Sequence, residues 1–411
     1  MHIYALKWII SFIFSLQCIF IYIVNIILTG VQLKDEYLMI QQSANEFARK
    51  EIMPVAAKMD RENFFPVDLF RKMGKEGYLG VTIPEEYGGS GSDYLSQAII
   101  EEEISYASGS LGLSYGAHSN LCLDNLYRNG SESLRENYVP GLCSGDSIGS
   151  LGMTEPSSGS DALAMKTTAD QDSGSFILNG SKTFITNAPY ANVFLVYART
   201  GKDITPFVVE SGDEGFSRGQ EFNKTGMRGS PTGTIFFNDI LLGPERVVGD
   251  LNGGKKVLLS GLNLERAILS FNAIGIARRA LDLAVSYASE RKQFGRPISD
   301  FELVQEKLAY MYTKFESSRL FAMEALERVQ NDRMDSLDAA SAILYASEAS
   351  EYIAREALQI FGGYGYIKDF EIERIFRDSI LLTIGAGTNE IRKKVISEAL
   401  VKKYRGDNSG R

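Results

Sequence analysis

The stretch RAILSFNAIGIARRALDLAVSYASERKQF, residues 266–294, decides the fold class. Its apolar residues recur at helical spacing and share one face of a long helix, at Ile268, Phe271, Ile274, Leu281, Ala284 and Tyr287. Such a helix has to bury that face against other helices, and helical spacing continues from about Gly254 to Tyr404. The sequence therefore predicts a bundle of long helices, with antiparallel neighbours wherever the loops are short.

Upstream of this bundle the sequence period changes twice. Residues 148–249 hold short β-rich runs such as FILNGSKTFITNA and TGTIFFNDILL, separated by Gly, Asn, Asp and Ser. Residues 33–142 show helical spacing again. We therefore expect an α–β–α order, with a helical domain at 33–147, a β domain at 148–252, a helical bundle at 253–404 and a polar tail at 405–411.

Composition restricts the function. The 411 residues carry 43 Lys and Arg against 52 Asp and Glu, a formal net charge of −9, whereas nucleic-acid-binding proteins usually carry a basic footprint. We therefore expect no nucleic-acid partner. Three cysteines and two histidines are too few for a disulfide framework or a Cys/His zinc site, so we expect no metal. The chemistry must then rest on carboxylates, hydroxyls, arginines or a bound cofactor.

The first 32 residues differ from the rest of the chain. Residues 8–28 carry no charge and are long enough to cross a bilayer as a helix. Two explanations stay open: a membrane anchor on a soluble enzyme, or an extension from a wrongly chosen start codon. We favour the second, because Ile, Phe, Tyr, Asn and Lys are what A/T-rich upstream DNA encodes. A cleaved signal peptide or a mitochondrial transit peptide fits less well, because no small-residue cleavage site follows and residues 1–32 contain no Arg.

Three motifs are candidate ligand sites. FGGYGY (Phe361–Tyr366) follows a helical run, and its glycines either stop that helix in a tight turn or let a ligand approach the backbone. In IGAGTNEIRK (Ile384–Lys393), Thr388 can cap a helix beginning at Asn389, whose free N–H groups face an anion or simply water. LGMTEPSSGSD (Leu151–Asp161) offers uncharged donors that suit a neutral ring system, and an ordinary turn explains it equally well.

Charged residues on the long helix also have two explanations each. Glu265 either complements the helix dipole in a first turn or, if it is buried beside a ligand, acts as a base with a raised pKa. Arg291 and Arg296 either complement the dipole at the other end of the helix or bind a pyrophosphate.

Taken together and in order, these motifs resemble the acyl-CoA dehydrogenase family over residues 33–404. The resemblance is carried by GLSYGAHSNLCLDNLYRNG (residues 112–130), LGMTEPSSGSD, KTFITNA, KTGMRGSPT, SGLNLERAILS, ERKQFGRPI, ALQIFGGYGYIKDFEIERIFRDS and IGAGTNEIR. It implies an α+β fold with an N-terminal helical domain, a middle β-barrel domain and a C-terminal four-helix bundle, assembled as a homotetramer. It also implies FAD as cofactor, an acyl-CoA as substrate and electron-transfer flavoprotein as electron acceptor. The implied location is the mitochondrial matrix in a eukaryote or the cytoplasm in a bacterium.

The resemblance assigns contacts residue by residue. The residues implied to contact FAD are Leu151, Met153, Thr154, Ser160, Phe184, Ile185, Thr186, Arg291, Glu302, Gln359, Gly362, Gly363, Thr388, Asn389 and Glu390. Among these, Arg291 is implied to reach the FAD pyrophosphate of a neighbouring subunit. The residues implied to contact the acyl-CoA are Ser160, Lys256, Asn263, Leu264, Arg266, Gly385, Ala386 and Gly387. The Ala386 N–H is implied to polarise the thioester carbonyl.

The position of the catalytic base separates branches of this family. Most straight-chain members place it in a Tyr-Glu-Gly-Thr motif, which here reads Gly385-Ala386-Gly387-Thr388 and contains no carboxylate. The isovaleryl and long-chain branches place it in the earlier helix, where this chain has Glu265. The resemblance therefore implies that Glu265 removes the α-proton of isovaleryl-CoA, giving 3-methylcrotonyl-CoA in leucine catabolism, and that Gly385 leaves room for the methyl branch.

Four residues depart from the family pattern: Phe184 replaces Trp, Glu302 replaces Gln, Asn263 replaces Asp and Lys256 replaces Tyr. Two alternatives therefore stay open. One is a long-chain or other branched acyl-CoA dehydrogenase, and the other is a catalytically silent member that acts as an assembly scaffold.

Overall fold

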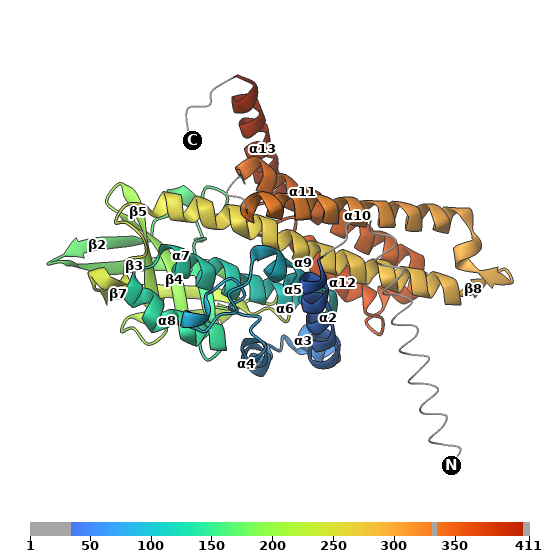
Figure 1. The fold of residues 1–411 in the computed structure, drawn as a ribbon, viewed down its shortest axis with the longest axis horizontal. Coiled ribbons are helices and arrows are strands. Elements are labelled where there is room, and N and C mark those ends of the chain that lie inside the picture. The colour runs from blue at the N-terminus through green and yellow to red at the C-terminus, as the bar shows by residue number, and fades with distance from the viewer. Residues whose placement is uncertain (1–33, 331–334, 406–411) are drawn as a thin grey trace, which may run out of the picture.

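The computed structural model describes residues 34–330 and 335–405. The expectations on residues 1–32, with the uncharged stretch 8–28, lie outside the described residues. Helices come first along the described chain, then a sheet, then longer helices, which is the order that the sequence predicts (Figure 1). In this view α9 and α11 run side by side along the long axis, with the sheet at one end.

The N-terminal block packs short helices around one buried helix, α5. Asp93 caps α5 by accepting a hydrogen bond from the Ser96 N–H, and every side chain from Ser96 to Ala107 is buried. α5 lies between α2 and the long helix α9. The helices of this block are α2 (Asp35–Phe47), η1 (Ala48–Ile52), α3 (Met53–Glu62), α4 (Val67–Lys75), η2 (Glu85–Tyr87), α5 (Tyr94–Ala107), α6 (Gly109–Gly116), η3 (Ala117–Asp124), α7 (Asn125–Asn129) and α8 (Glu132–Ser144).

The middle of the chain forms one seven-stranded sheet. Its strands are β1 (Gly149–Gly152), β2 (Thr168–Asp172), β3 (Ser175–Thr186), β4 (Val193–Thr200), β5 (Asp203–Glu210), β6 (Phe216–Glu221) and β7 (Thr232–Leu242). β4 pairs with β5 and, in parallel, with β1 and β2, while β3 links β2 to β7 and β7 pairs with β6.

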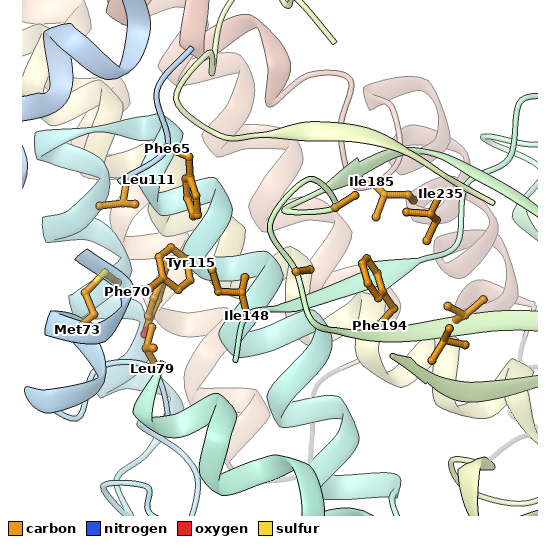
Figure 2. Close-up of a cluster of buried hydrophobic side chains, with 14 of the residues drawn as sticks. Phe65, Phe70, Met73, Leu79, Leu111, Tyr115, Ile148, Ile185, Phe194 and Ile235 are labelled. Carbon is orange, nitrogen blue, oxygen red and sulfur yellow. The ribbon is translucent and has the colours of Figure 1, made fainter. Parts of the chain in front are cut away.

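The sheet curls but its ladder stays open. The rings of Phe194 on β4 and Phe216 on β6 approach to 5.0 Å between centroids, which brings distant strands face to face. Among the described residues no ladder joins β5 to β6, so the expected barrel is an open, curved sheet by its hydrogen bonds. Figure 2 shows its core, with Phe194, Ile185 and Ile235, continuing into the N-terminal helices at Tyr115 and Phe70.

The C-terminal block is the predicted bundle of long helices. α9 (Gly254–Glu290) buries Ile268, Phe271, Ile274, Leu281 and Ala284 and half-buries Tyr287, so the face predicted from spacing is confirmed. It packs against α10 (Glu302–Gln330), α11 (Ser336–Phe361) and α12 (Ile372–Leu381). α13 (Asn389–Tyr404) packs on α11, and a short hairpin of β8 (Lys292–Gln293) and β9 (Arg296–Pro297) follows α9. Within the described ranges no helix is both long and apolar enough to span a bilayer.

Candidate active site

The side chain of Glu265 is buried on α9 without a partner. Only 3% of the residue is exposed, and its Oε2 atom has no hydrogen-bond partner within the described chain. Burial raises the pKa of this carboxyl to about 7. Because α9 begins at Gly254, Glu265 lies about three full turns into the helix, so the explanation as a first-turn residue that complements the helix dipole is wrong.

The segment Gly385–Gly387 lies next to the same part of α9. A Cβ atom added at Gly387 would lie 3.6 Å from Arg266 Nη2, and Ala386 and Gly387 both have positive φ, at 53° and 88°. Arg392, fully buried, donates from Nη2 to the Gly385 carbonyl at 2.7 Å and fixes this turn. The Ala386 N–H donates to no backbone carbonyl of the described residues. A carboxyl and an available N–H donor therefore belong to neighbouring segments.

The helix cap predicted at Thr388 is confirmed, because the Thr388 hydroxyl accepts from the Ile391 N–H at the start of α13. Asn389 is buried, and its Oδ1 accepts from Arg392 Nη1 at 2.7 Å. This side-chain oxygen is therefore used inside the protein, whereas Glu390 is exposed.

Behind the loop Leu151–Ser160 lies a buried ion pair that the sequence analysis missed. Lys182 Nζ donates to Glu155 Oε1 at 2.8 Å, and both side chains are almost fully buried. Glu155 also accepts from the backbone N–H groups of Lys166, at 2.6 Å, and Thr167, at 2.9 Å. The sequence did contain a signal for it. Lys182 follows Phe176 and Leu178 by an even number of residues on the same strand, so its side chain points inward as theirs do.

The pair fixes the backbone at the loop residues expected to line a cofactor. Lys182 Nζ also donates to the Met153 carbonyl at 3.1 Å, and the Thr183 N–H donates to the Thr154 carbonyl at 2.8 Å. Leu151, Met153 and Thr154 are half-buried and Ser160 is exposed. The loop is therefore anchored on the sheet side and open on its outer side.

At the end of β3 the side chains alternate between surface and core. Phe184 is 67% exposed, has a φ of 57°, and contacts the ring of Phe222, with ring centroids 5.1 Å apart. Thr186 is half-buried. Ile185 lies in the hydrophobic core, so a ligand could meet its backbone but not its side chain (Figure 2). A positive φ is strained for a bulky residue such as Phe184, and strained positions of this kind cluster at functional sites.

A second group of predicted residues lies at the other end of α9. Arg291, Gly362 and Gly363 line a cavity of about 440 Å³ together with Tyr364. A Cβ atom added at either of these glycines would meet no atom within 4 Å. Arg291 follows Glu265 by 26 residues, which along one helix corresponds to about 39 Å. Within one chain this group and the Glu265 group are therefore separate.

The remaining predicted residues surround these two groups. Lys256 is exposed, and Asn263 is half-buried with its Oδ1 accepting from Arg266 Nη1 at 3.5 Å. Leu264 is buried in the helical core. Glu302 and Gln359 are exposed, at the start of α10 and near the end of α11.

Fold and site together define a class of enzyme, and the sequence comparisons agree. The chain belongs to the acyl-CoA dehydrogenase family: it matches the N-terminal domain at residues 34–146, the middle domain at 150–240 and the C-terminal domain at 252–401. The α+β fold class is thereby confirmed, and the family consists of flavoproteins that act on acyl-CoA substrates.

The chain is similar to family members whose names give different acyl-CoA substrates. The chain is 43% identical to the mitochondrial isovaleryl-CoA dehydrogenase of Solanum tuberosum, over 91% of this chain and 92% of that protein. It is 42% identical to the mitochondrial 2-methylacyl-CoA dehydrogenase of the same plant, with the same coverage. The butyryl-CoA dehydrogenase structure from Megasphaera elsdenii superposes with a TM-score of 0.88 at 32% identity, over 90% of this chain and all of that chain.

Proposed function

We propose that the protein catalyses the FAD-dependent α,β-dehydrogenation of a short branched acyl-CoA, isovaleryl-CoA first, with Glu265 as the base. One observation carries the proposal: the Glu265 carboxyl is buried with an oxygen that no group of the described residues uses. The segment Ile384–Thr388 contains no carboxylate that could compete for this role.

The proton step follows from the state of this carboxyl. A base works best when its pKa is near the working pH, and burial raises the pKa of Glu265 to about 7. Its free oxygen would take the α-proton of the thioester, while the Ala386 N–H would stabilise the negative charge that develops on the thioester oxygen. The buried Arg392 holds the backbone of that donor segment in place through the Gly385 carbonyl.

The residues present fit FAD. The anchored loop Leu151–Ser160 and the exposed Phe184 offer donors and an aromatic surface for the flavin, and the open glycines beside Arg291 offer a place for its other half. When bound, FAD supplies the acceptor for the β-hydride. Because Arg291 is about 39 Å from Glu265 along one chain, it would serve the FAD of a neighbouring subunit. The proposal therefore includes at least a second subunit, and the family resemblance extends it to a homotetramer.

The substrate class rests on Gly385 and on the relatives. A Cβ atom added at Gly385 would approach only Leu381, at 3.5 Å or more, so this position has space for a methyl branch. The similar identities to isovaleryl- and 2-methylacyl-CoA dehydrogenases also favour a branched chain. A 2-methyl-branched acyl-CoA is therefore the second candidate substrate. We further propose electron-transfer flavoprotein as the electron acceptor, a mitochondrial matrix location if the source is a eukaryote, and a domain division at 33–147, 148–252 and 253–404.

An anaerobic visible spectrum of the purified full chain, before and after addition of isovaleryl-CoA, tests the proposal. We expect a yellow protein whose flavin absorbance falls after each addition of isovaleryl-CoA. Bleaching by 2-methylbutyryl-CoA but not isovaleryl-CoA would keep the reaction and change the substrate. A protein that takes up no FAD would overturn the proposal and favour an assembly scaffold.

A further inference from the structure

Glu101 on α5 is a second buried carboxyl, and it has no part in the base or cofactor contacts proposed above. Its neighbours Glu102 and Glu103 are also buried, and each lies 2.7 Å from a guanidinium nitrogen of Arg278. Glu101 has no cation among the described residues. Its Oε1 accepts from Ser105 Oγ at 2.9 Å and from Asn272 Nδ2 at 3.0 Å.

The other oxygen of this carboxyl has no partner in the described part of the chain. Glu101 is 1% exposed and its Oε2 makes no hydrogen bond. Burial raises the pKa of Glu101 to about 8, and the nearby charge of Glu265 adds to this shift. At neutral pH the carboxyl is therefore mostly protonated, and because Oε1 already accepts two bonds, Oε2 holds a donor with no acceptor.

Glu101, on α5, packs against the same face of α9 that carries Glu265. Asn272, which binds Glu101, follows Glu265 by seven residues, two helical turns or about 10 Å, and therefore points to the same side. Two nearby positions are glycine. A Cβ atom at Gly112 would lie 2.7 Å from Glu101 Oε1, and one at Gly116 would lie 3.6 Å from Oε2. Side chains at these positions would crowd the carboxyl.

The change in burial along α9 indicates the direction of the acyl chain from Glu265. Before Glu265, α9 exposes Lys255, Lys256 and Ser260, whereas every residue from Leu264 to Ala277 is buried. The charged CoA has to stay on the exposed side, because burying phosphates without partners is costly. The hydrocarbon end therefore runs toward Asn272 and Glu101.

We propose that the Glu101 carboxyl forms the polar end of the acyl site and restricts the enzyme to short acyl chains. This inference rests on the proposed function. A five-carbon chain leaves room for water to bind Oε2. A longer chain displaces that water and covers a polar group that has no other partner, which disfavours its binding by roughly tenfold or more.

The test compares three full-length, FAD-loaded proteins: the wild type, Glu101→Met and Glu101→Gln. The first variant removes the polar group at similar volume, and the second keeps it. For each protein, kcat/KM is measured with isovaleryl-, hexanoyl-, octanoyl- and lauroyl-CoA. Dissociation constants for the matching unreactive 2-enoyl-CoA thioesters are measured by calorimetry. Melting temperature and bound-flavin absorbance show that each variant is folded, and Glu101→Leu replaces Glu101→Met if the latter does not fold.

We expect Glu101→Met to raise the octanoyl-to-isovaleryl ratio about tenfold in both kcat/KM and affinity. Glu101→Gln should keep that ratio within about twofold, since an amide also needs hydrogen bonds. The inference is overturned if all three proteins share one ratio, or if Glu101→Gln shifts it as much as Glu101→Met. If the wild type oxidises none of the short thioesters, the proposed function fails, and the affinities alone still decide the role of Glu101.

Discussion

Two buried carboxyls of this protein are in opposite environments. Glu155, behind the loop Leu151–Ser160, is paired with Lys182 and with two backbone N–H groups. Although burial alone would raise its pKa, these hydrogen bonds outweigh burial and lower it. Glu265 is buried without a cation from the described residues, and burial raises its pKa to about 7. The same residue type therefore stays ionised in one place and close to its titration point in the other.

The difference separates positioning from chemistry. A carboxylate whose oxygens are already satisfied can anchor a loop but has little capacity left for a substrate proton. A carboxyl with a free oxygen and a pKa near neutrality is unfavourable for folding and suited to proton transfer. On α5 the same contrast recurs between Glu103, paired with Arg278, and Glu101, which meets no cation in the described chain.

Replacing the unpaired carboxyl should have the largest effect on turnover. We expect Glu265→Gln to lower kcat at least about 10³-fold, because a positioned base contributes about 10²–10⁴ and nothing else in the segment Gly385–Gly387 can take the proton. Bound FAD and the affinity for unreactive acyl-CoA analogues should stay near wild type. Stopped-flow flavin reduction measures the step directly. Near-normal reduction in this variant would refute the assignment of the base.

A relocated carboxylate sharpens the same test. In a Glu265→Gly background, Ala386→Glu places a carboxylate on the segment next to α9, where the family resemblance places the base of straight-chain members. We expect part of the rate to return with a changed chain-length preference. A double variant as inactive as Glu265→Gly alone would indicate that the two segments do not face the same acyl carbon.

Breaking the paired carboxyl should instead destabilise the protein. Lys182→Met leaves Glu155 buried without its cation, which typically costs about 3–5 kcal/mol. We expect a lowered midpoint in urea unfolding and weaker retention of FAD, because Lys182 also holds the Met153 carbonyl. Lys202→Met, at an exposed turn lysine, is the control and should stay within about 0.5 kcal/mol of wild type. Equal stability of the two variants would show that the buried pair contributes nothing.

Local patterns in the sequence predicted what depends on neighbouring residues. The period of residues 266–294 predicted the buried face of α9, and Thr388 predicted the start of α13 at Asn389, because both depend on residues a few positions apart. The assignment of the base to Glu265 came from the family resemblance: residues 385–388 lack the carboxylate of the straight-chain motif, and local patterns alone left the role of Glu265 open.

Pairing across the chain could not be predicted in the same way. Lys182 and Glu155 are 27 positions apart, and Glu101 meets Asn272 across 171 positions. No local pattern determines which distant groups meet in the core, because those contacts depend on how whole elements pack. A hint was present at Glu101: three consecutive glutamates follow Ile99 and Ile100 in a helix that is otherwise uncharged, a pattern that favours buried ion pairs.

The two carboxyls should also give opposite responses to pH. The folded-state pKa of Glu265 is raised from 4.5 to about 7. Between pH 4.5 and 7 the native state therefore keeps a proton that the unfolded state releases. Stability from this group is then present below pH 4.5 and lost as the pH rises to 7, by about 3 kcal/mol in total. Glu155, with a lowered pKa, contributes stability above its unfolded value that is lost as the pH falls.

The same raised pKa should appear in the kinetics. We expect kcat/KM to fall about tenfold per pH unit below pH 7, because only ionised Glu265 accepts a proton.

Urea unfolding of wild type and Glu265→Gln from pH 5 to 8 checks the predicted change in stability. The difference between the two proteins should widen with pH in favour of the amide. A constant difference would mean that the Glu265 carboxyl is solvated in the native protein.

Removing both members of the buried pair should have the smallest effect. The double variant Glu155→Gln/Lys182→Met leaves no buried charge behind, and replacing a whole buried pair by neutral groups is often close to neutral. We expect its stability to lie within about 1–2 kcal/mol of wild type, well above that of Lys182→Met alone, because the amide oxygen that replaces the Glu155 carboxylate would keep accepting the Thr167 N–H. Urea unfolding of the full double-mutant cycle measures this coupling. If the double variant were no more stable than Lys182→Met, the cost of the single change would come from lost packing around Met153 and Met165. Glu155 and Glu265 would then differ mainly in how well their surroundings are packed, and the ion pair with Lys182 would contribute little to stability.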